Sequence, residues 1–403
     1  MIDLGLGRIA RLLKLIDNPH LAGWKAVHVA GTNGKGSVCA YVSSCLYRAN
    51  VVTGRFTSPH LVNKWDCIAV NEKPISEDLF RQSEMMVSQA NKTHNVGATE
   101  FELLTATAFD IFRKQQVEVA IVEVGLGGRL DSTNVLPPEH TLVTVITKVG
   151  LDHQNLLGST LGQIGREKAG IIKHQVACVV DATNDKQVLD SVLEIAQEQG
   201  SQLIFAEPDT LQFNVPSNAT PLLGAYQLCN LSCALNALTA ISKTYPQLTD
   251  AAVLDGIRNT SWPGRLQWLE LEGGEKHVLL DGAHNKQASE LLKQYIDSSV
   301  RKTDDQPVTY VLAFSQGKDY ADVLKTLLQP QDRVIVTTFG DVDGMPWVRP
   351  CPTGEVASVA ASLITSPVVQ EQNPIKALHA APDSAVVCGS LYLVGHVLRF
   401  HGK

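Results

Sequence analysis

Gly34 and Lys35 lie in a glycine-rich loop, "GTNGKGS" at residues 31–37, which directly follows the apolar run 25–30. The backbone amides of such a loop, a lysine ammonium and the start of a helix can together surround phosphate oxygens. The common spacing GxxxxGK[ST] is not matched, because Val29 stands at the first glycine and Gly36 follows the lysine. Ser37 is then the nearest hydroxyl for a metal ion. The pattern predicts a nucleotide-binding loop with irregular spacing.

Further polar residues lie at or after the ends of other apolar runs of the chain. Ser58 lies in "TSPHLVNKW", Glu123 is the last residue but one of "VEVAIVEV", and His153 lies in "LDHQNLLG" after "TLVTVITKV". In an open parallel sheet, ligands bind beyond the carboxyl ends of the strands, so we expect these residues to face the phosphate loop. Hydroxyl, carboxylate and imidazole groups suit Mg²⁺. Lys168 follows in "GREKAGIIK", on a predicted helix.

Each of these residues also has a plain structural interpretation. Glu123 could cap the next turn, His153 could be an ordinary loop histidine, and Lys168 by default is a solvated helix lysine. "GLGGRLD" at 125–131 lacks the spacing of the dinucleotide fingerprint GxGxxG, so we discount a nicotinamide cofactor. Cys229 and Cys233 have no histidine or further cysteine nearby in the sequence, which favours core packing over a metal site.

The elements that must position these residues alternate along the chain. Six short apolar runs predict buried strands, and the stretches between them have helical spacing. Strands that are apolar on both faces predict a mostly parallel sheet covered by helices. The predicted strands are 25–30, 50–57, 117–124, 141–149, 175–181 and 201–205, and the predicted helices are 36–49, 76–94, 100–115, 160–171, 184–199 and 227–243.

The pattern restarts after a segment rich in Pro and Gly at 262–275. Four more apolar runs, 277–285, 308–315, 332–340 and 384–390, alternate with helical stretches. A boundary in such a segment separates two domains. We therefore predict a first α/β domain at 1–265 and a smaller α/β domain at 266–403.

Composition limits the function classes. The chain has 403 residues, 44% of them hydrophobic, which allows a sizeable core in two domains. The formal net charge of −7 and the absence of a long basic run argue against a nucleic-acid partner. No uncharged apolar run reaches about 18 residues, so we expect no membrane span. The eight scattered cysteines predict reduced thiols, and we expect a cytoplasmic protein without excluding a mitochondrial pool.

Several segments together resemble one family. "HVAGTNGKGSV", "FTSPHL", "EVGLGGRLDSTN", "LDHQNLLGSTLGQIGREKAGI", "WPGRL", "LLDGAHN" and "VCGSLYL" occur in the order found in dihydrofolate synthases and folylpolyglutamate synthases, the folate branch of the Mur ligase superfamily. The family's loop has the shorter form GxxGKG[ST], which accounts for the spacing at 31–37. The resemblance implies a P-loop ATPase domain that also binds the pterin, followed by a Rossmann-like domain.

The resemblance also implies roles for individual residues. It assigns ATP contacts to Gly31, Thr32, Asn33, Gly34, Lys35, Gly36, Ser37, Asn230, Arg265 and Asp281. The implied Mg²⁺ ligands are Ser58, Glu123 and His153, with Lys168 as a carbamate that ligates a second Mg²⁺. Lys35, His153, Lys168 and His284 would act in catalysis, His284 near the acyl phosphate and the incoming amino acid. The pterin-bearing substrate would contact Asp3, Leu4, Thr99, Leu130 and Asp131.

The implied reaction joins L-glutamate to 7,8-dihydropteroate with ATP, through an acyl phosphate. After "TSPHL" this chain has "VNKWDCIAVN", where polyglutamate synthases and bifunctional members carry an Arg- and Glu-rich stretch. This departure makes the chain similar to fungal monofunctional dihydrofolate synthases, and we expect a monomer. A folylpolyglutamate synthase or a bifunctional enzyme is the main alternative. A nucleotide-binding module without ligase chemistry and a kinase are alternatives of other classes.

Overall fold

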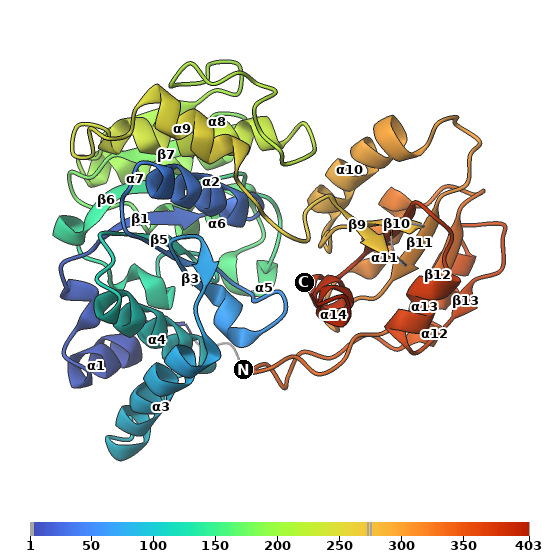
Figure 1. Cartoon of the computed structure of the whole chain (residues 1–403), viewed down its shortest axis with the longest axis horizontal. Helices are drawn as coiled ribbons and strands as arrows, with labels where there is room; N and C mark the ends of the chain where they lie inside the picture. Colours follow the sequence, from blue (N-terminus) through green and yellow to red (C-terminus); the bar gives the residue numbers. More distant parts are fainter. Residues whose placement is uncertain (1–3, 272–273, 275, 403) are drawn as a thin grey trace. The chain divides into compact units, whose positions relative to one another are not determined.

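A computed structural model describes residues 4–271, 274 and 276–402 of the chain (Figure 1). The first eight strands form one sheet. Its order is β4-β3-β2-β5-β1-β6-β7-β8, in which β2, β5, β1, β6, β7 and β8 run parallel. The strands are β1 Lys25–Ala30, β2 Thr53–Phe56, β3 Ile68–Val70, β4 Lys73–Pro74, β5 Val119–Glu123, β6 Thr141–Ile146, β7 Cys178–Asp181 and β8 Leu203–Ala206.

Helices cover both faces of this sheet. Ala26 and Ala30, on one face of β1, belong to apolar clusters built with α1, α3, α4, α6 and α7. On the other face α2 packs against α8 and α9 (Figure 1). The helices are α1 Gly7–Leu15, α2 Lys35–Arg48, α3 Glu77–Thr93, α4 Glu100–Lys114, α5 Gln154–Leu157, α6 Leu161–Ala169, α7 Lys186–Glu198, α8 Gln227–Ile241 and α9 Asp250–Arg258. This doubly covered, mostly parallel sheet confirms the predicted fold class.

Short 3₁₀ turns join several of these elements, at Pro19–Leu21, Lys64–Cys67, Ser132–Val135 and Pro138–His140. Trp24 lies fully buried beneath the first of them, with its ring centroid 5.3 Å from that of Phe109 and 5.8 Å from that of Phe112. The predicted strand 25–30 is buried at every position except Lys25, as an internal strand requires.

The second half forms a sheet of its own. Its order is β13-β12-β11-β14-β10-β9, and only β9 is antiparallel to its neighbour among the strand pairs that the structure describes. The strands are β9 Gln267–Leu271, β10 Lys276–Leu280, β11 Thr309–Leu312, β12 Arg333–Val336, β13 Val369–Gln370 and β14 Ala385–Cys388. The helices are α10 Lys286–Tyr295, the π-helix Ile296–Val300, α11 Tyr320–Leu327, α12 Thr353–Ala361, α13 Pro374–Ala380 and α14 Leu391–Phe400.

The chain divides into two units around these sheets. Unit 1 comprises Met1–His60, Trp65–Pro221 and Tyr226–Ser261, and unit 2 comprises Leu61–Lys64, Leu222–Ala225 and Trp262–Lys403. Two short pieces that lie between segments of unit 1 in the sequence therefore belong to unit 2. In unit 2, Leu61 packs closely against Gly395. A Cβ at residue 395 would lie 1.7 Å from Leu61 O, so only glycine fits there.

Some elements differ from the sequence-based prediction. β3 and β4 form an antiparallel hairpin that was not predicted, and its turn residues Asn71 and Glu72 have φ of 51° and 65°. Asn tolerates this conformation, but the pair lacks the usual glycine of a tight hairpin. All eight cysteines are free, and only Cys229 is not fully buried. Within the described part of the chain, every helix is too short or too polar to cross a bilayer.

Candidate functional site

The loops that carry the candidate residues leave neighbouring strands at one edge of the sheet. β2, β5, β1 and β6 are consecutive and parallel, so their carboxyl ends lie side by side. The loops that follow contain Ser58, Glu123, the phosphate loop and His153. The sheet order therefore brings together residues that lie far apart in the sequence, as expected for ligand sites in open sheets.

The phosphate loop enters α2 directly, since Lys35 is the first helical residue. Gly34 has φ of 92°, and a Cβ there would lie 2.2 Å from Asn230 Oδ1. Glycine is required at this position by both conformation and space. The Nζ of Lys35 donates a hydrogen bond to Thr32 O at 3.3 Å, so the lysine folds back over its own loop.

α8 supplies two amide side chains to this loop. Asn230 is buried against Gly34, and its Nδ2 donates to Gln227 Oε1 at 3.0 Å. The Nε2 of Gln227 in turn lies 3.4 Å from Ser37 Oγ. Gln227 was not singled out in the sequence; its spacing three residues before Asn230 on one helix was the available signal.

Glu123 ends β5 beside the phosphate loop. The side chain is 5% exposed, and its Oε2 accepts a hydrogen bond from Ser58 N at 3.1 Å. Its Oε1 lies 3.8 Å from Lys35 Nζ. The carboxylate therefore connects the loop after β2 with the loop after β1. This arrangement disfavours the interpretation of Glu123 as a simple turn cap.

Lys168 is buried at the start of the same loop. Its Nζ donates to Gly31 O at 2.8 Å, and the side chain is on the inner face of α6. Burial, reinforced by the positive charge of Lys35, lowers the pKa of Lys168 from 10.5 to about 7. Because the side chain is buried and hydrogen-bonded to Gly31, the interpretation as a solvated helix lysine was wrong.

His153 lies at the start of α5, in the loop after β6. It has φ of 51°, its backbone N donates to Asp152 Oδ1 at 2.8 Å, and its Nε2 lies 3.8 Å from Asp152 Oδ2. The imidazole is 40% exposed. It is therefore accessible at the carboxyl edge of the sheet, and Asp152 is the carboxylate beside it.

Asp131 ends the turn 125–131, and its side chain is 1% exposed. Its Oδ1 accepts from Thr133 N at 3.0 Å and from Thr133 Oγ1 at 2.5 Å, and its Oδ2 accepts from Leu126 N at 2.8 Å. Thr133 Oγ1 lies 2.9 Å from His28 Nε2, on β1. Burial raises the pKa of Asp131. The carboxylate therefore shapes this turn from within.

The other expected substrate residues lie around the N-terminal segment. Leu4 adjoins Gly5, whose N donates to Leu130 O at 3.2 Å. Thr99 caps α4 in a capping box with Glu102, and Arg8 Nε donates to the same carboxylate at 3.0 Å. Hydrogen bonds thus connect the segments that carry Leu4, Leu130 and Thr99 to α1, α4 and the turn 125–131. Asp3 lies outside the described residues.

Unit 2 holds the remaining candidates at the end of β10. Asp281 accepts from Leu266 N at 2.9 Å and from Ala283 N at 2.8 Å, and burial raises its pKa although Arg265 lowers it. A Cβ on Gly282 would lie 2.6 Å from Arg265 Nη1, and His284 Nδ1 is 2.7 Å from Gly282 O. Arg265, Asp281 and His284 therefore surround Gly282.

The candidate metal ligands do not form a metal site from acidic, histidine and cysteine side chains alone. Within residues 4–271, 274 and 276–402, no three such side chains are close enough together to hold an ion. Glu123 and His153 offer one carboxylate and one imidazole, and Ser58 adds a hydroxyl. This donor set fits Mg²⁺ or Mn²⁺, which are bound by few protein ligands together with water and substrate phosphates.

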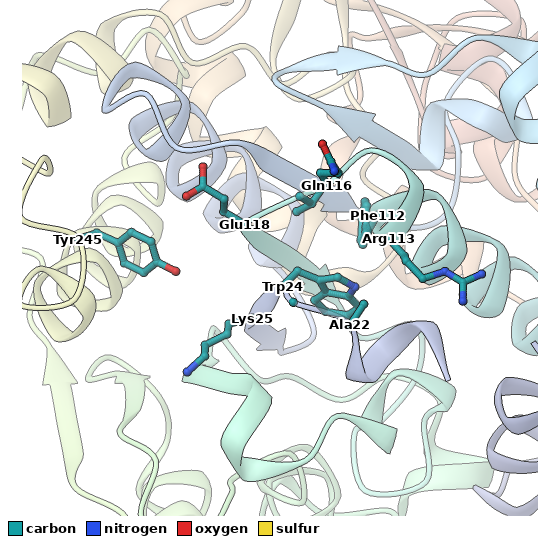
Figure 2. A pocket seen from close by; sticks show the side chains of 10 residues that line it. Ala22, Trp24, Lys25, Phe112, Arg113, Gln116, Glu118 and Tyr245 are labelled. Carbon is teal, nitrogen blue, oxygen red and sulfur yellow. The ribbon is translucent and has the colours of Figure 1, made fainter. Parts of the chain in front are cut away.

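A hollow of about 440 Å³ lies at the opposite edge of the sheet of unit 1 (Figure 2). Lys25 begins β1 there, Glu118 directly precedes β5, and Trp24 and Tyr245 also line it. Two of its charged groups are engaged by the fold: Glu118 Oε1 accepts from Val52 N at 2.9 Å, and Arg113 Nη2 donates to Asp110 Oδ1 at 2.6 Å. This hollow is therefore separate from the candidate site.

Comparisons with known proteins identify relatives of this chain. Residues 265–400 match the family model of the dihydrofolate synthetase C-terminal domain. The chain is 38% identical to a probable dihydrofolate synthetase of Schizosaccharomyces pombe, over 99% of this chain and 98% of that protein. It is also 38% identical to the dihydrofolate synthetase of Saccharomyces cerevisiae, over 100% of this chain and 99% of that protein.

A solved structure has the same fold over the whole chain. It is the bifunctional folylpolyglutamate synthase/dihydrofolate synthase of Yersinia pestis, complexed with AMPPNP and a Mn ion. The TM-score is 0.81 and the identity 26%, and the match covers 100% of this chain and 94% of that chain.

Proposed function

Because this chain belongs to the family of dihydrofolate synthetases and folylpolyglutamate synthases, we propose that it joins L-glutamate to 7,8-dihydropteroate, with ATP converted to ADP and phosphate. The similarity over the full length to two fungal dihydrofolate synthetases supports this acceptor. A folylpolyglutamate synthase or bifunctional activity is the second candidate, favoured by the likeness to the Yersinia pestis enzyme. The chain is an ATP-dependent ligase in either case.

One observation carries the proposal: a phosphate loop, a carboxylate and a buried lysine meet at one sheet edge. Lys35 Nζ is 3.8 Å from Glu123 Oε1, and Lys168 Nζ is 2.8 Å from Gly31 O. Phosphoryl transfer needs little covalent chemistry from a protein, and depends on positioning and on neutralising charge. The loop amides of residues 31–37 and the ammonium of Lys35 are suited to both tasks.

The proposed reaction has two steps. An oxygen of the dihydropteroate carboxylate attacks the γ-phosphorus of ATP, and the bond from this phosphorus to the bridging oxygen breaks to release ADP. The amine of glutamate then attacks the acyl carbon, loses a proton, and displaces phosphate as the C–O bond breaks. Activation is needed because a carboxylate would otherwise have to expel oxide. Lys35 holds the charge that develops on the transferred group.

We propose that Ser58, Glu123 and His153 hold a Mg²⁺ ion. The ion supplies charge neutralisation for the transferring phosphoryl group when it is bound. Its place in this chain is supported by the donor set and by Glu123, which joins the phosphate loop to Ser58. The Yersinia pestis relative, complexed with a Mn ion, also supports a divalent metal.

We further propose that Lys168 carries a carbamate and serves a second Mg²⁺. A neutral amine that takes up CO₂ and releases a proton becomes an anionic oxygen ligand, whereas an ammonium would repel the metal. The burial of Lys168 and its proximity to Lys35 favour the neutral amine. A carbamate nitrogen keeps one N–H, so it can still donate to Gly31 O.

The remaining assignments follow the same scheme. Asn230, Arg265 and Asp281 would contact the nucleotide, and His284 would lie near the acyl phosphate and the incoming glutamate. Leu4, Thr99 and Leu130 would line the pterin pocket. Asp131 would contribute by holding the turn 125–131, since its carboxylate accepts hydrogen bonds from this turn and from Thr133. We propose a cytoplasmic monomer with domains near 1–265 and 266–403.

Phosphate release tests the proposal. The assay supplies ATP, Mg²⁺ and glutamate with either dihydropteroate or tetrahydrofolate. We expect glutamate-dependent release with dihydropteroate and not with tetrahydrofolate, and its loss in Lys35→Ala. Release with tetrahydrofolate would instead assign chain extension. Release with neither acceptor would leave only a nucleotide-binding module without ligase chemistry.

A further inference from the structure

The segment 147–150, which links β6 to the loop of His153, is hydrogen-bonded along its length to the phosphate loop. Thr32 N and Asn33 N both donate to Lys148 O, at 2.8 Å and 3.1 Å. Thr32 Oγ1 donates to Gly150 O at 3.1 Å and accepts from Gly150 N at 3.0 Å. Backbone groups of the two loops thus form a short ladder, which fixes one loop against the other.

Thr147 completes this ladder from inside the fold. It is fully buried, and its Oγ1 donates to Asn33 O at 2.8 Å and lies 3.3 Å from Ala30 O. A Cβ on Gly31 would lie 1.8 Å from the same oxygen. The hydroxyl therefore occupies the space that a side chain at residue 31 would take. Gly31 and Thr147 are a matched pair.

Asn184 holds the same segment from the opposite side. It lies just after β7 and is 6% exposed. Its Oδ1 accepts from Val149 N at 2.8 Å, and its Nδ2 donates to Thr147 O at 3.2 Å and Asp181 O at 3.0 Å. These partners fix the orientation of the amide, because Val149 offers a donor and the other two offer acceptors.

We propose that Thr147 and Asn184 are positioning residues that set the distance between the phosphate loop and His153. Segment 147–150 is held between the two side chains and ends three residues before His153. A loop that is already ordered loses little conformational freedom when it binds phosphate, and donors fixed in place stabilise transferring charge better than mobile ones. This inference rests on the proposed function of the site.

Both side chains are buried, so they act through the loops rather than on the substrate. A misplacement of reacting groups by about 1 Å can cost roughly 100-fold in rate, even when its cause lies away from the chemistry. Removing the donor of Thr147 removes its hydrogen bond to Asn33 O, and removing Asn184 removes its hydrogen bonds to Val149 N and Thr147 O. Either change loosens the same segment.

The test uses Thr147→Val, which keeps the shape and removes the donor, and Asn184→Ala. Thr147→Ser keeps the hydroxyl. Thr107→Val is the matched control, because Thr107 is equally buried and donates to a backbone carbonyl, Leu103 O at 2.8 Å, within α4. The measurements are the Kd for ADP by calorimetry, kcat and KM for ATP, and the unfolding temperature.

We expect Thr147→Val and Asn184→Ala each to raise the Kd for ADP and to lower kcat/KM for ATP by about 10- to 100-fold. Thr147→Ser should restore both, and Thr107→Val should leave both within about twofold at a similar unfolding temperature. The double variant should lose less than the product of the single losses, since both residues hold one segment.

The proposal is overturned if Thr147→Val matches Thr107→Val in ADP affinity and in kcat/KM, or if the two losses multiply in full. Should Thr147→Val not fold, Asn184→Ala compared with Thr107→Val carries the test: equal ADP affinity and equal kcat/KM in these two variants would overturn the proposal. A wild-type protein without turnover would contradict the proposed function alone. The affinities for ADP would then still decide the roles of Thr147 and Asn184.

Discussion

The side-chain nitrogen of Lys168 donates a hydrogen bond to the backbone carbonyl of Gly31, 137 residues away in the sequence, over 2.8 Å. A buried lysine is thereby tied to the first residue of the phosphate loop. The contact joins α6 to β1 at the point where the loop begins. Lys168 is consequently placed to affect both the loop and the charge around it.

Replacing Lys168 tests its proposed carbamate. We expect Lys168→Ala to lower kcat by about 100-fold or more, the scale on which a positioned electrostatic group contributes. Added acetate or propionate should restore part of the rate by replacing the lost carboxylate. Lys276→Ala is the control, because Lys276 is also buried and donates to Leu378 O, but in unit 2. If added acetate or propionate does not raise the rate of Lys168→Ala, the result would argue against the carbamate.

Glu123 and Glu118, at opposite ends of β5, allow a proposed metal ligand to be compared with a structural carboxylate. Glu123→Gln should still accept from Ser58 N but loses the charge beside Lys35. We expect kcat/KM to fall by about 100-fold, with partial recovery at higher Mg²⁺ or Mn²⁺ concentration. Glu118→Gln, at the amino end of β5, should behave like the wild type in the same titration. Equal behaviour of the two variants would remove Glu123 from the metal site.

The packing of α9 on α2 predicts a stability change at Gly256. A Cβ there would lie 2.4 Å from Cys45 Cα and 2.8 Å from Cys45 N, so the backbones must move apart. We expect Gly256→Ala to lower the free energy of unfolding in urea by about 2 kcal/mol, since overpacking outweighs the better helix propensity of alanine. Gly7→Ala is the control, with nothing within 4 Å of its Cβ. A stability gain at Gly256 would contradict this account.

Stability should also depend on pH through His20. Burial lowers the pKa of His20 from 6.5 to about 4, and the charge of His140 makes a smaller contribution in the same direction. Between these values the unfolded chain binds a proton and the folded chain does not, so the free energy of unfolding falls as pH drops through this window. At pH above 6.5 the effect is absent.

Urea unfolding of His20→Gln and of wild type, at pH 7.0 and 5.0, checks this dependence. The wild type should lose more stability than the variant between the two values. The exposed His94, at the end of α3, provides the control variant His94→Gln, which should follow the wild type. Parallel curves for all three proteins would refute the role of His20.

The sequence was sufficient for the parts of the fold that have a local pattern. The run 25–30 is apolar after Lys25 except at His28, and with its glycine-rich continuation it predicted both β1 and the phosphate loop. Because the carboxyl ends of parallel strands lie at one edge, the sequence also predicted that Glu123 and His153 lie at the edge of the phosphate loop. The hairpin of β3 and β4 was not predicted, since three-residue and two-residue strands carry too little periodicity to detect.

The supporting side chains could not be found in this way. Asn184 and Gln227 act through contacts with segments that are distant in sequence, and their residue types are common in turns and on helices. Asp131 illustrates the same limit, because its position after the glycine-rich turn is visible in the sequence, whereas the inward direction of its carboxylate depends on Thr133 and Leu126.

The central place of β1 has a consequence for synthesis on the ribosome. β1 pairs on one side with β5 and on the other with β6, both of which leave the ribosome much later. A nascent chain that ends before residue 146 therefore keeps an apolar strand with an open edge, a state prone to aggregation. Such non-local pairing also slows folding. The phosphate loop is translated early, but it can form its hydrogen bonds to Lys148 only after the segment around Lys148 has left the ribosome.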